Sequence, residues 1–484
     1  MNKPNVLLIC VDHWPAQMIG ALGHPTVLTP TIDQFITNGV AFTNAYSTTP
    51  MCVPARRELM TGVYARTHGD RNQRSLPLPD IPTLAQTFRD SGYQTYGVGK
   101  LHVTPSRDRI GFDDMLLNEE GRMKANRDGQ QVDDYEMYLT EQGHAGQEFA
   151  HGHSNNYDVK PWHLPEHTHS TNWTARETAR SIVRRDPTRP AFWYMSFTAP
   201  HPPMNPLPDY LNLYRDMEID PPYIGEWAQD FDQLPHALKA RPRRISSRAF
   251  NEAATRQIRE AFYALSTHID HQIRTVIGTL KEEGILDDTI VMFTSDHGDM
   301  LGNHGTYTKM CFYEDSTNVP LVLVPTAHLQ ERLGNDRRDL RLATLADIMP
   351  TLLDLCDISI PESVEGQSLV SDAPREHVYG EFYDDPAVAT RMIRDQRHKL
   401  IYYPVGNVFQ LFDLQDDPRE LHDLSAEQKY QDVRKKLTTQ LIDHLYGADL
   451  EWIQDGQLVG LPEMIWRGEI PERNLGGQRG LRFK

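Results

Sequence analysis

Two aspartate–histidine pairs are the residues of this chain best suited to hold a metal ion. Asp12 and His13 follow an apolar run that begins at Asn5, and Asp296 and His297 follow a second predicted strand. Carboxylate oxygens suit hard cations such as Ca²⁺ or Mg²⁺, whereas imidazoles lean toward softer divalent metals. A single aspartate after a strand usually caps a turn, but two such pairs in the same setting favour a metal site.

A cysteine is the third candidate. Cys52 lies at the predicted N-terminus of a helix, shortly before Pro54 and one turn before Arg56. The partial positive charge of a helix N-terminus stabilises an anion, so a thiol there is a candidate nucleophile of lowered pKa. The alternative is a buried structural cysteine, which is the commoner fate of a single thiol.

The elements that must position these residues predict an α/β fold. Residues 5–11 form a continuous apolar run, which is typical of a strand buried on both faces of a parallel sheet. Short β-rich runs alternate with helical patterns, so we expect a large, mixed, mostly parallel sheet sandwiched by helices. Ligands bind outside the carboxyl ends of parallel strands, which is where both aspartate–histidine pairs fall. The predicted strands are 5–11, 40–46, 94–98, 191–199, 289–295 and 321–324, and the predicted helices are 31–38, 54–61, 83–91, 171–185, 251–283 and 345–355.

The chain divides into three predicted parts. Residues 1–374 form the α/β domain, 375–446 a smaller C-terminal domain, and 447–484 a C-terminal arm. Short alternating runs with turns predict an antiparallel sheet in the second part, followed by a closing helix. The arm has no clear period but carries apolar residues such as Trp452 and Trp466. The simpler interpretation is that the arm docks on its own domain. The more specific one is that the arm docks on a neighbouring subunit and forms a homo-oligomer.

Between residues 114 and 170 the periodicity fades. The segment is rich in Asp, Glu, Gln and Gly, and we interpret it as a solvated surface insertion. A histidine-rich metal site is the competing hypothesis, but the spacing of the histidines is irregular. They are His144, His151, His153, His163, His167 and His169.

Composition excludes several classes of protein. The chain has 484 residues, with 49 Lys and Arg against 67 Asp and Glu, so its formal net charge is −18. Such acidity argues against a nucleic-acid partner, and no apolar run approaches the roughly 20 residues of a membrane helix. With no secretory signal and widely spaced cysteines, we expect reduced thiols in a cytoplasm rather than disulfides or a zinc knuckle. The cysteines are Cys10, Cys52, Cys311 and Cys356.

Several motifs resemble one known family. Cys52-x-Pro54-x-Arg56, followed by Thr61-Gly62, resembles the signature of the sulfatases of the alkaline phosphatase superfamily, whose cysteine is oxidised after translation to formylglycine. Further segments resemble that family in the same order along the chain, from about residue 5 to about residue 445. They are Asn5 to Asp12, Gly99-Lys100-Leu101-His102, Pro200-His201-Pro202-Pro203, Thr294 to Asp299 with Lys309 downstream, and Leu411 to Leu414 with Asp417-Pro418.

The resemblance implies a sulfuric ester hydrolase with an alkaline-phosphatase-like fold. It would convert the sulfate monoester of a small organic molecule or saccharide to alcohol and inorganic sulfate, after a maturase has made the formylglycine. The cofactor would be one divalent metal, first Ca²⁺ and otherwise Mg²⁺ or Mn²⁺. Its ligands would be Asp12, His13, the modified Cys52, Asp296 and His297.

The resemblance also implies roles for the basic residues. Arg56 would hold the hydrated formylglycine, one oxygen of which attacks sulfur. Lys100 and Lys309 would bind the sulfate oxygens as point charges. His102 would be the base that collapses the sulfated hemiacetal, and His201, with Lys309, would help to protonate the leaving oxygen. Each could instead be an ordinary surface lysine or a loop histidine.

Two positions and two functions stay open. His13 departs from the family, in which many members carry a second Asp and others a Gln, so His13 is either the fourth ligand or a strand cap. Asp299 is either an outer partner of the metal site or a turn residue. A phosphonate monoester or phosphodiester hydrolase on the same scaffold is the alternative function. A catalytically silent binding protein with unmodified Cys52 is the third hypothesis.

Overall fold

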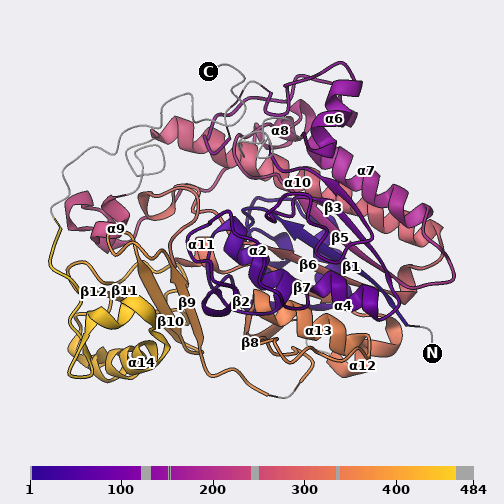
Figure 1. The fold of residues 1–484 in the computed structure, drawn as a ribbon. Helices are drawn as coiled ribbons and strands as arrows, with labels where there is room; N and C mark the ends of the chain where they lie inside the picture. Colours follow the sequence, from indigo (N-terminus) through magenta and orange to yellow (C-terminus); the bar gives the residue numbers. More distant parts are fainter. Residues whose placement is uncertain are drawn as a thin grey trace.

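A large mixed sheet organises the molecule (Figure 1). The computed structural model describes residues 3–120, 132–150, 152, 154–240, 250–333, 338–371 and 373–464. Strand β7 runs antiparallel to both of its neighbours, and the other pairs in this sheet are parallel. The eight strands lie in the order β4 (Asp114–Leu117), β3 (Gln94–Gly99), β5 (Ala191–Phe197), β1 (Asn5–Val11), β6 (Thr289–Ser295), β7 (Leu321–Val324), β2 (Val40–Tyr46) and β8 (Arg338–Thr344).

Helices cover both faces of the sheet, so neighbouring residues of β1 enter different cores. Leu7 and Ile9 pack with one set of helices, and Val6 and Leu8 pack with the other. The first set is α1 (Pro30–Asn38), α7 (Ser170–Val183), α8 (Pro208–Tyr214) and α10 (Glu252–Glu282). The second is α2 (Cys52–Thr61), α4 (Leu84–Asp90) and α13 (Ile348–Leu355). This is the burial on both faces that the apolar run predicts.

A smaller antiparallel sheet follows in the C-terminal part of the chain. Its order is β12 (Val408–Asp413), β11 (His398–Tyr403), β10 (Thr390–Arg394) and β9 (Val378–Phe382). Helix α14 (Gln431–His444) covers one face through Leu437 and Leu441. The other face packs on Phe312 and Tyr313, which lie between β6 and β7 in the chain. The predicted fold class is therefore confirmed, although the division into three parts stays a prediction.

The interpretation of residues 114–170 as a solvated insertion is wrong for much of its length. The segment supplies edge strand β4 and helix α6 (Asp134–Glu141), and Tyr135 and Leu139 are buried against Trp173. His151 and His153 lie outside the described residues. None of the other four histidines belongs to a described group of side chains close enough to share a metal ion.

The remaining elements are short. The first half of the arm forms a two-stranded sheet of β13 (Ile453–Gln454) and β14 (Gln457–Leu458), and Trp452 is buried beside the small sheet. Residues 465–484, including Trp466, lie outside the described residues. The prediction of an oligomer depends largely on this segment and stays a prediction.

No helix among the described residues has the length and apolar character to cross a membrane. The other α-helices of the described residues are α3 (Ala65–His68), α9 (His236–Lys239), α11 (Glu314–Thr317) and α12 (Gln330–Leu333).

Candidate active site

The parallel register of two central strands brings the aspartate–histidine pairs together. Strands β1 and β6 are neighbours, and Val11 pairs with Ser295, so Asp12 and Asp296 leave the sheet side by side. The backbone N–H of Asp296 donates to the Val11 carbonyl at 3.3 Å, which continues the ladder to the first aspartate. All four residues of the two pairs are buried.

Helix α2 brings Cys52 to the same point. The helix runs from Cys52 to Thr61 and every residue of it is buried; Gly62, which follows it, is in the left-handed conformation, with φ +67°. The Cys52 sulfur lies 3.2 Å from His297 Nε2, 3.1 Å from Lys309 Nζ and 3.9 Å from Asp12 Oδ1. The thiol therefore sits between a group that can ligate a metal and a cation.

Four of the side chains fit a divalent metal ion. The donor atoms of Asp12, His13, Cys52 and His297 all lie within 4.8 Å of one another. His297 Nδ1 lies 3.0 Å from the Gly298 carbonyl and can donate to it, so the lone pair of Nε2 is directed at this group. One carboxylate, two imidazoles and a sulfur in place of the modified side chain form a donor set suited to a divalent cation.

Asp296 lies beside this group but is shared with Arg56. Its Oδ2 accepts a hydrogen bond from Arg56 Nε at 2.8 Å, and its Oδ1 is 3.7 Å from His297 Nε2. The Arg56 guanidinium also donates to the Lys100 carbonyl at 2.7 Å and to Ser196 Oγ at 2.8 Å. Residues at the carboxyl ends of β3 and β5 thus fix the Arg56 side chain, and Arg56 links Asp296 to helix α2.

Lys100 closes a second acidic group. Asp12, Glu120 and His201 also have donor atoms within 4.8 Å of one another, but the Lys100 ammonium donates to both carboxylates, at 3.0 Å for Glu120. An ammonium therefore stands where a second cation would bind. Burial and the Cys52 charge would raise the pKa of Asp12, but Lys100 and the nearby histidines hold it far below its usual value.

The same cations act on Cys52. Burial alone would raise the pKa of the thiol, but Lys309 and Lys100 lower it well below its usual value, with help from His297 and a hydrogen bond with His102. These charges favour an anion at this position. His102 is held by its backbone N–H, which donates to Glu119 at 3.0 Å, and its φ of +61° is left-handed.

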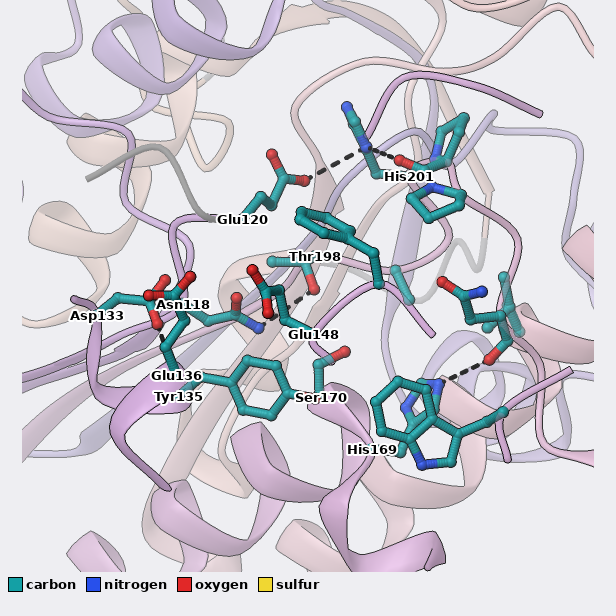
Figure 2. Close-up of a pocket in the computed structure, with 17 residues that line it drawn as sticks. Asn118, Glu120, Asp133, Tyr135, Glu136, Glu148, His169, Ser170, Thr198 and His201 are labelled. Atoms are coloured by element: carbon teal, nitrogen blue, oxygen red, sulfur yellow. Dashed lines mark hydrogen bonds and ion pairs between the residues drawn. The ribbon is translucent and has the colours of Figure 1, made fainter. Parts of the chain in front are cut away.

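His201 lies at the boundary between this centre and a cavity. Its Nδ1 lies 2.7 Å from the Pro202 carbonyl, to which it can donate, and 3.4 Å from Glu120, while Nε2 has no hydrogen-bond partner among the described residues. Burial holds the pKa of the ring well below its usual value. A cavity beside it encloses about 550 Å³ including its open mouth. Glu120, His201 and Tyr135 are among its walls (Figure 2).

The sequence pattern does not indicate two further residues of the site, Glu120 and Tyr157, and it leaves the role of a third, Asp299, open. Glu120 contacts Lys100, and Tyr157 donates to Asp299, which also accepts from His13 Nδ1 at 2.6 Å. Glu120 and Tyr157 lie in the segment without periodicity, where no local signal distinguishes them. Asp299 carries a signal, because it follows the second aspartate–histidine pair, but interpreting it as a mere turn residue is wrong: it is buried and directed at His13.

Comparison with known proteins agrees with this geometry. The family model described as sulfatase matches residues 4–358, and a second model, N-sulphoglucosamine sulphohydrolase, C-terminal, matches residues 302–446. The arylsulfatase of Clostridium perfringens is 34% identical over 482 residues, which cover 95% of this chain and 98% of that protein.

Solved structures share the fold. The phosphonate monoester hydrolase of Agrobacterium radiobacter superposes with a TM-score of 0.78 at 24% identity, over 91% of this chain and 95% of that one. A 2-O GAG sulfatase superposes with a TM-score of 0.70 at 23% identity, over 92% of each chain.

This mixed sheet between two layers of helices, with the site at the carboxyl ends of its central strands, defines an α/β protein of alkaline-phosphatase-like fold. Within that class the chain belongs to the sulfatase family, since the family model covers the residues that converge at the end of β1 and β6. The family resemblance seen in the motifs is thereby confirmed. The chain is a sulfuric ester hydrolase.

Proposed function

We propose that this chain hydrolyses a sulfate monoester with a formylglycine made from Cys52 and one divalent cation. The contacts of Cys52 carry the proposal: its sulfur touches His297 Nε2 at 3.2 Å and Lys309 Nζ at 3.1 Å. The oxygens of a hydrated formylglycine would stand where that sulfur stands. A nucleophile there would lie beside the metal ligands and beside a cation able to bind a sulfate oxygen.

The modification solves a chemical problem of this reaction. A formylglycine hydrate supplies two hydroxyl groups on one carbon, one to attack sulfur and one whose deprotonation expels sulfate. A serine would lack the second hydroxyl and would stop at the ester. A cation held by Asp12, His13 and His297 would supply Lewis acidity and would lower the pKa of the attacking hydroxyl. We propose that a maturase makes the formylglycine in the native host.

The chain's own residues divide the remaining work. Arg56, which donates to Asp296 and to the Lys100 carbonyl, would hold the hydrated formylglycine. Lys309 and Lys100 would bind sulfate oxygens. Asp12 and Glu120 hold the Lys100 ammonium in position. These roles are electrostatic and need preorganised charges, which burial of both lysines supports.

Two histidines handle protons. His102, which contacts the Cys52 side chain, would remove the proton that collapses the sulfated intermediate. The leaving oxygen would take its proton from the pair formed by His201 and Lys309. His201 would donate in its protonated form, which the negative charge of a bound sulfate favours: Nδ1 donates to the Pro202 carbonyl, and Nε2, which is buried and has no described partner, carries the second proton and faces that oxygen.

The alcohol of the ester would occupy the cavity beside His201 (Figure 2), because His201 is a wall of both the cavity and the centre. We propose a small organic or carbohydrate sulfate as substrate. The relative from Clostridium perfringens is called an arylsulfatase, which supports an aryl sulfate as a first probe. The net charge of −18 disfavours long polyanionic substrates by repulsion.

The finer assignments belong to the same proposal. We propose Ca²⁺ as the metal, with Mn²⁺ and Mg²⁺ as alternatives that metal analysis of the purified protein would separate. We propose a cytoplasmic location, supported by four cysteines that are all free thiols in the structure. Fractionation of the native host would test the location.

One experiment separates the candidate functions. The kcat/KM of purified, modified protein is compared for an aryl sulfate, a phenylphosphonate ester and a phosphodiester, and the mass of the Cys52 peptide is measured in parallel. We expect a formylglycine mass and a preference for the sulfate. Preference for a phosphorus ester would favour the alternative hydrolase, and an unmodified thiol in protein from the native host would favour the silent binding protein.

A further inference from the structure

His13 lies at the centre of a chain of buried hydrogen bonds that leads away from the metal group. Its Nδ1 lies 2.6 Å from Asp299 Oδ2, and the same oxygen accepts from the Tyr157 hydroxyl. The other oxygen, Oδ1, accepts from the backbone N–H groups of Leu301 at 3.0 Å and Thr308 at 3.1 Å.

The donors around Asp299 decide which nitrogen of His13 carries a proton. Backbone N–H groups can only donate, so Asp299 Oδ1 is an acceptor, and an ionised carboxylate accepts at both oxygens. The Tyr157 hydroxyl and the two backbone N–H groups all donate to this side chain, as they do to an ionised carboxylate. His13 Nδ1 must therefore donate, and in the neutral ring Nε2 is left with a lone pair.

That lone pair faces the metal group. His13 Nε2 lies 3.7 Å from Asp12 Oδ1 and belongs to the cluster of donor atoms within 4.8 Å of one another. Lys309 Nζ is 2.6 Å from the same nitrogen. The Lys309 ammonium needs the electron pair at Nε2, and a metal ion that took the place of this contact would need the same pair, so either contact requires the proton to stay on Nδ1.

We propose that Asp299, supported by Tyr157, is a positioning residue that makes His13 a neutral metal ligand by fixing its proton on Nδ1. The inference rests on the metal site of the proposed function and deepens it. A carboxylate that accepts from the far nitrogen of a ligating imidazole fixes the ring and raises its basicity as a ligand. His13 then completes the cation site without adding a negative charge, and the other open interpretation, a strand cap, is set aside.

Metal affinity, measured without substrate, tests this proposal. The full-length protein is stripped of metal by a chelator and titrated with Ca²⁺ and with Mn²⁺ by calorimetry. Asp299→Asn keeps the acceptor oxygen for Leu301 and Thr308 but offers an amide that can donate to Nδ1, which favours the wrong tautomer. We expect its affinity for both ions to fall about 10- to 100-fold.

A double-mutant cycle separates positioning from a structural role. In a His13→Gln background the ligand has no tautomer to fix, so adding Asp299→Asn should weaken metal binding no further. Asp315→Asn is the matched control, because Asp315 is also buried and accepts from a tyrosine hydroxyl, that of Tyr223, but does not contact His13. It should bind both ions as the unaltered protein does.

Two results would overturn the proposal. The first is an Asp299→Asn protein that binds Ca²⁺ and Mn²⁺ as tightly as the unaltered chain. The second is a loss of the same size with and without His13, which would mean that Asp299 acts through its loop. If Asp299→Asn does not fold, Tyr157→Phe replaces it in the same cycle, with a smaller loss expected. Absence of sulfatase activity would not affect these titrations, so failure of the proposed function is seen separately.

Discussion

Replacing Lys309 with methionine removes one charge from the site and keeps an unbranched side chain of similar length. Lys309 Nζ lies 3.1 Å from the sulfur of Cys52, where the reacting oxygen would stand, and the residue is buried. A preorganised donor at this distance acts on charge that develops during reaction, and removing one such donor costs about 10²- to 10³-fold in kcat, or about 2.7–4 kcal/mol. We expect a loss of that size in Lys309→Met, with the fold retained.

Lys399 is the matched control, because it is also a fully buried lysine but serves the small sheet. Its ammonium lies 2.6 Å from Glu314 and 2.6 Å from Glu420. Removing one partner of a buried ion pair leaves uncompensated charge and costs about 3–5 kcal/mol of stability. Lys399→Met should therefore lower the free energy of unfolding while the folded fraction keeps its kcat.

The two variants are compared by kcat on an aryl sulfate, with the formylglycine content of each preparation measured by mass spectrometry, and by urea unfolding. The reasoning fails if Lys309→Met retains a kcat within about tenfold of the unaltered enzyme at equal formylglycine content. It also fails if folded Lys399→Met loses activity as Lys309→Met does, because burial of a lysine, rather than its contact with Cys52, would then explain both results.

Three further outcomes are expected. Chelation should abolish activity, and readdition of the divalent ion that metal analysis finds in the protein should restore it; full activity after verified removal of metal would contradict the assigned site. Burial lowers the pKa of His169 from 6.5 to about 4, so the unfolded chain binds a proton first as pH falls, and stability is lost below about pH 6.5 by up to about 1.4 kcal/mol per pH unit. His169→Gln should reduce the total slope by up to about 1.4 kcal/mol per pH unit, because other histidines with a lowered pKa, such as His24 and His304, still contribute. A variant whose free energy of unfolding falls as steeply as that of the unaltered chain between pH 6.5 and 4.5 would refute the assignment. Asp449, at the start of the arm, accepts from Arg71 at 2.9 Å and from Arg391 at 2.8 Å, so Asp449→Asn should cost about 3–5 kcal/mol in urea unfolding and leave kcat unchanged.

The centre of the sheet could be predicted from the sequence because burial on both faces demands apolar residues. That rule fails at the two edge strands of the sheet, and the sequence pattern predicts neither β4 nor β8. Strand β8 begins with residues that alternate between exposed and half-buried, and β4 has four residues, so neither gives the apolar run that identifies a central strand. The motif residues at the ends of β1 and β6 can be predicted because each aspartate–histidine pair directly follows an apolar strand in the sequence.

The partners of those motif residues could not be found in the same way. Glu120 meets Lys100 across 20 positions, and Tyr157 meets Asp299 across 142. Both come from a segment whose polar composition resembles that of an exposed loop. Only the crossing of that segment over the ends of the strands makes them part of the site, and no local pattern records such a crossing.

Backbone conformation explains how side chains just beyond a strand can turn back to one point. His13 and His102, which follow β1 and β3, both have left-handed backbone, with φ of +65° and +61°. Gly99, at the end of β3, has φ +105°, and a Cβ there would lie 1.8 Å from the Ser196 carbonyl oxygen. Residues other than glycine are strained in the left-handed conformation, and this strain persists only where the surrounding structure enforces it. The turn that ends each strand is thus held by the sheet itself, which is why His13 can present one nitrogen to Asp299 and the other to the metal group.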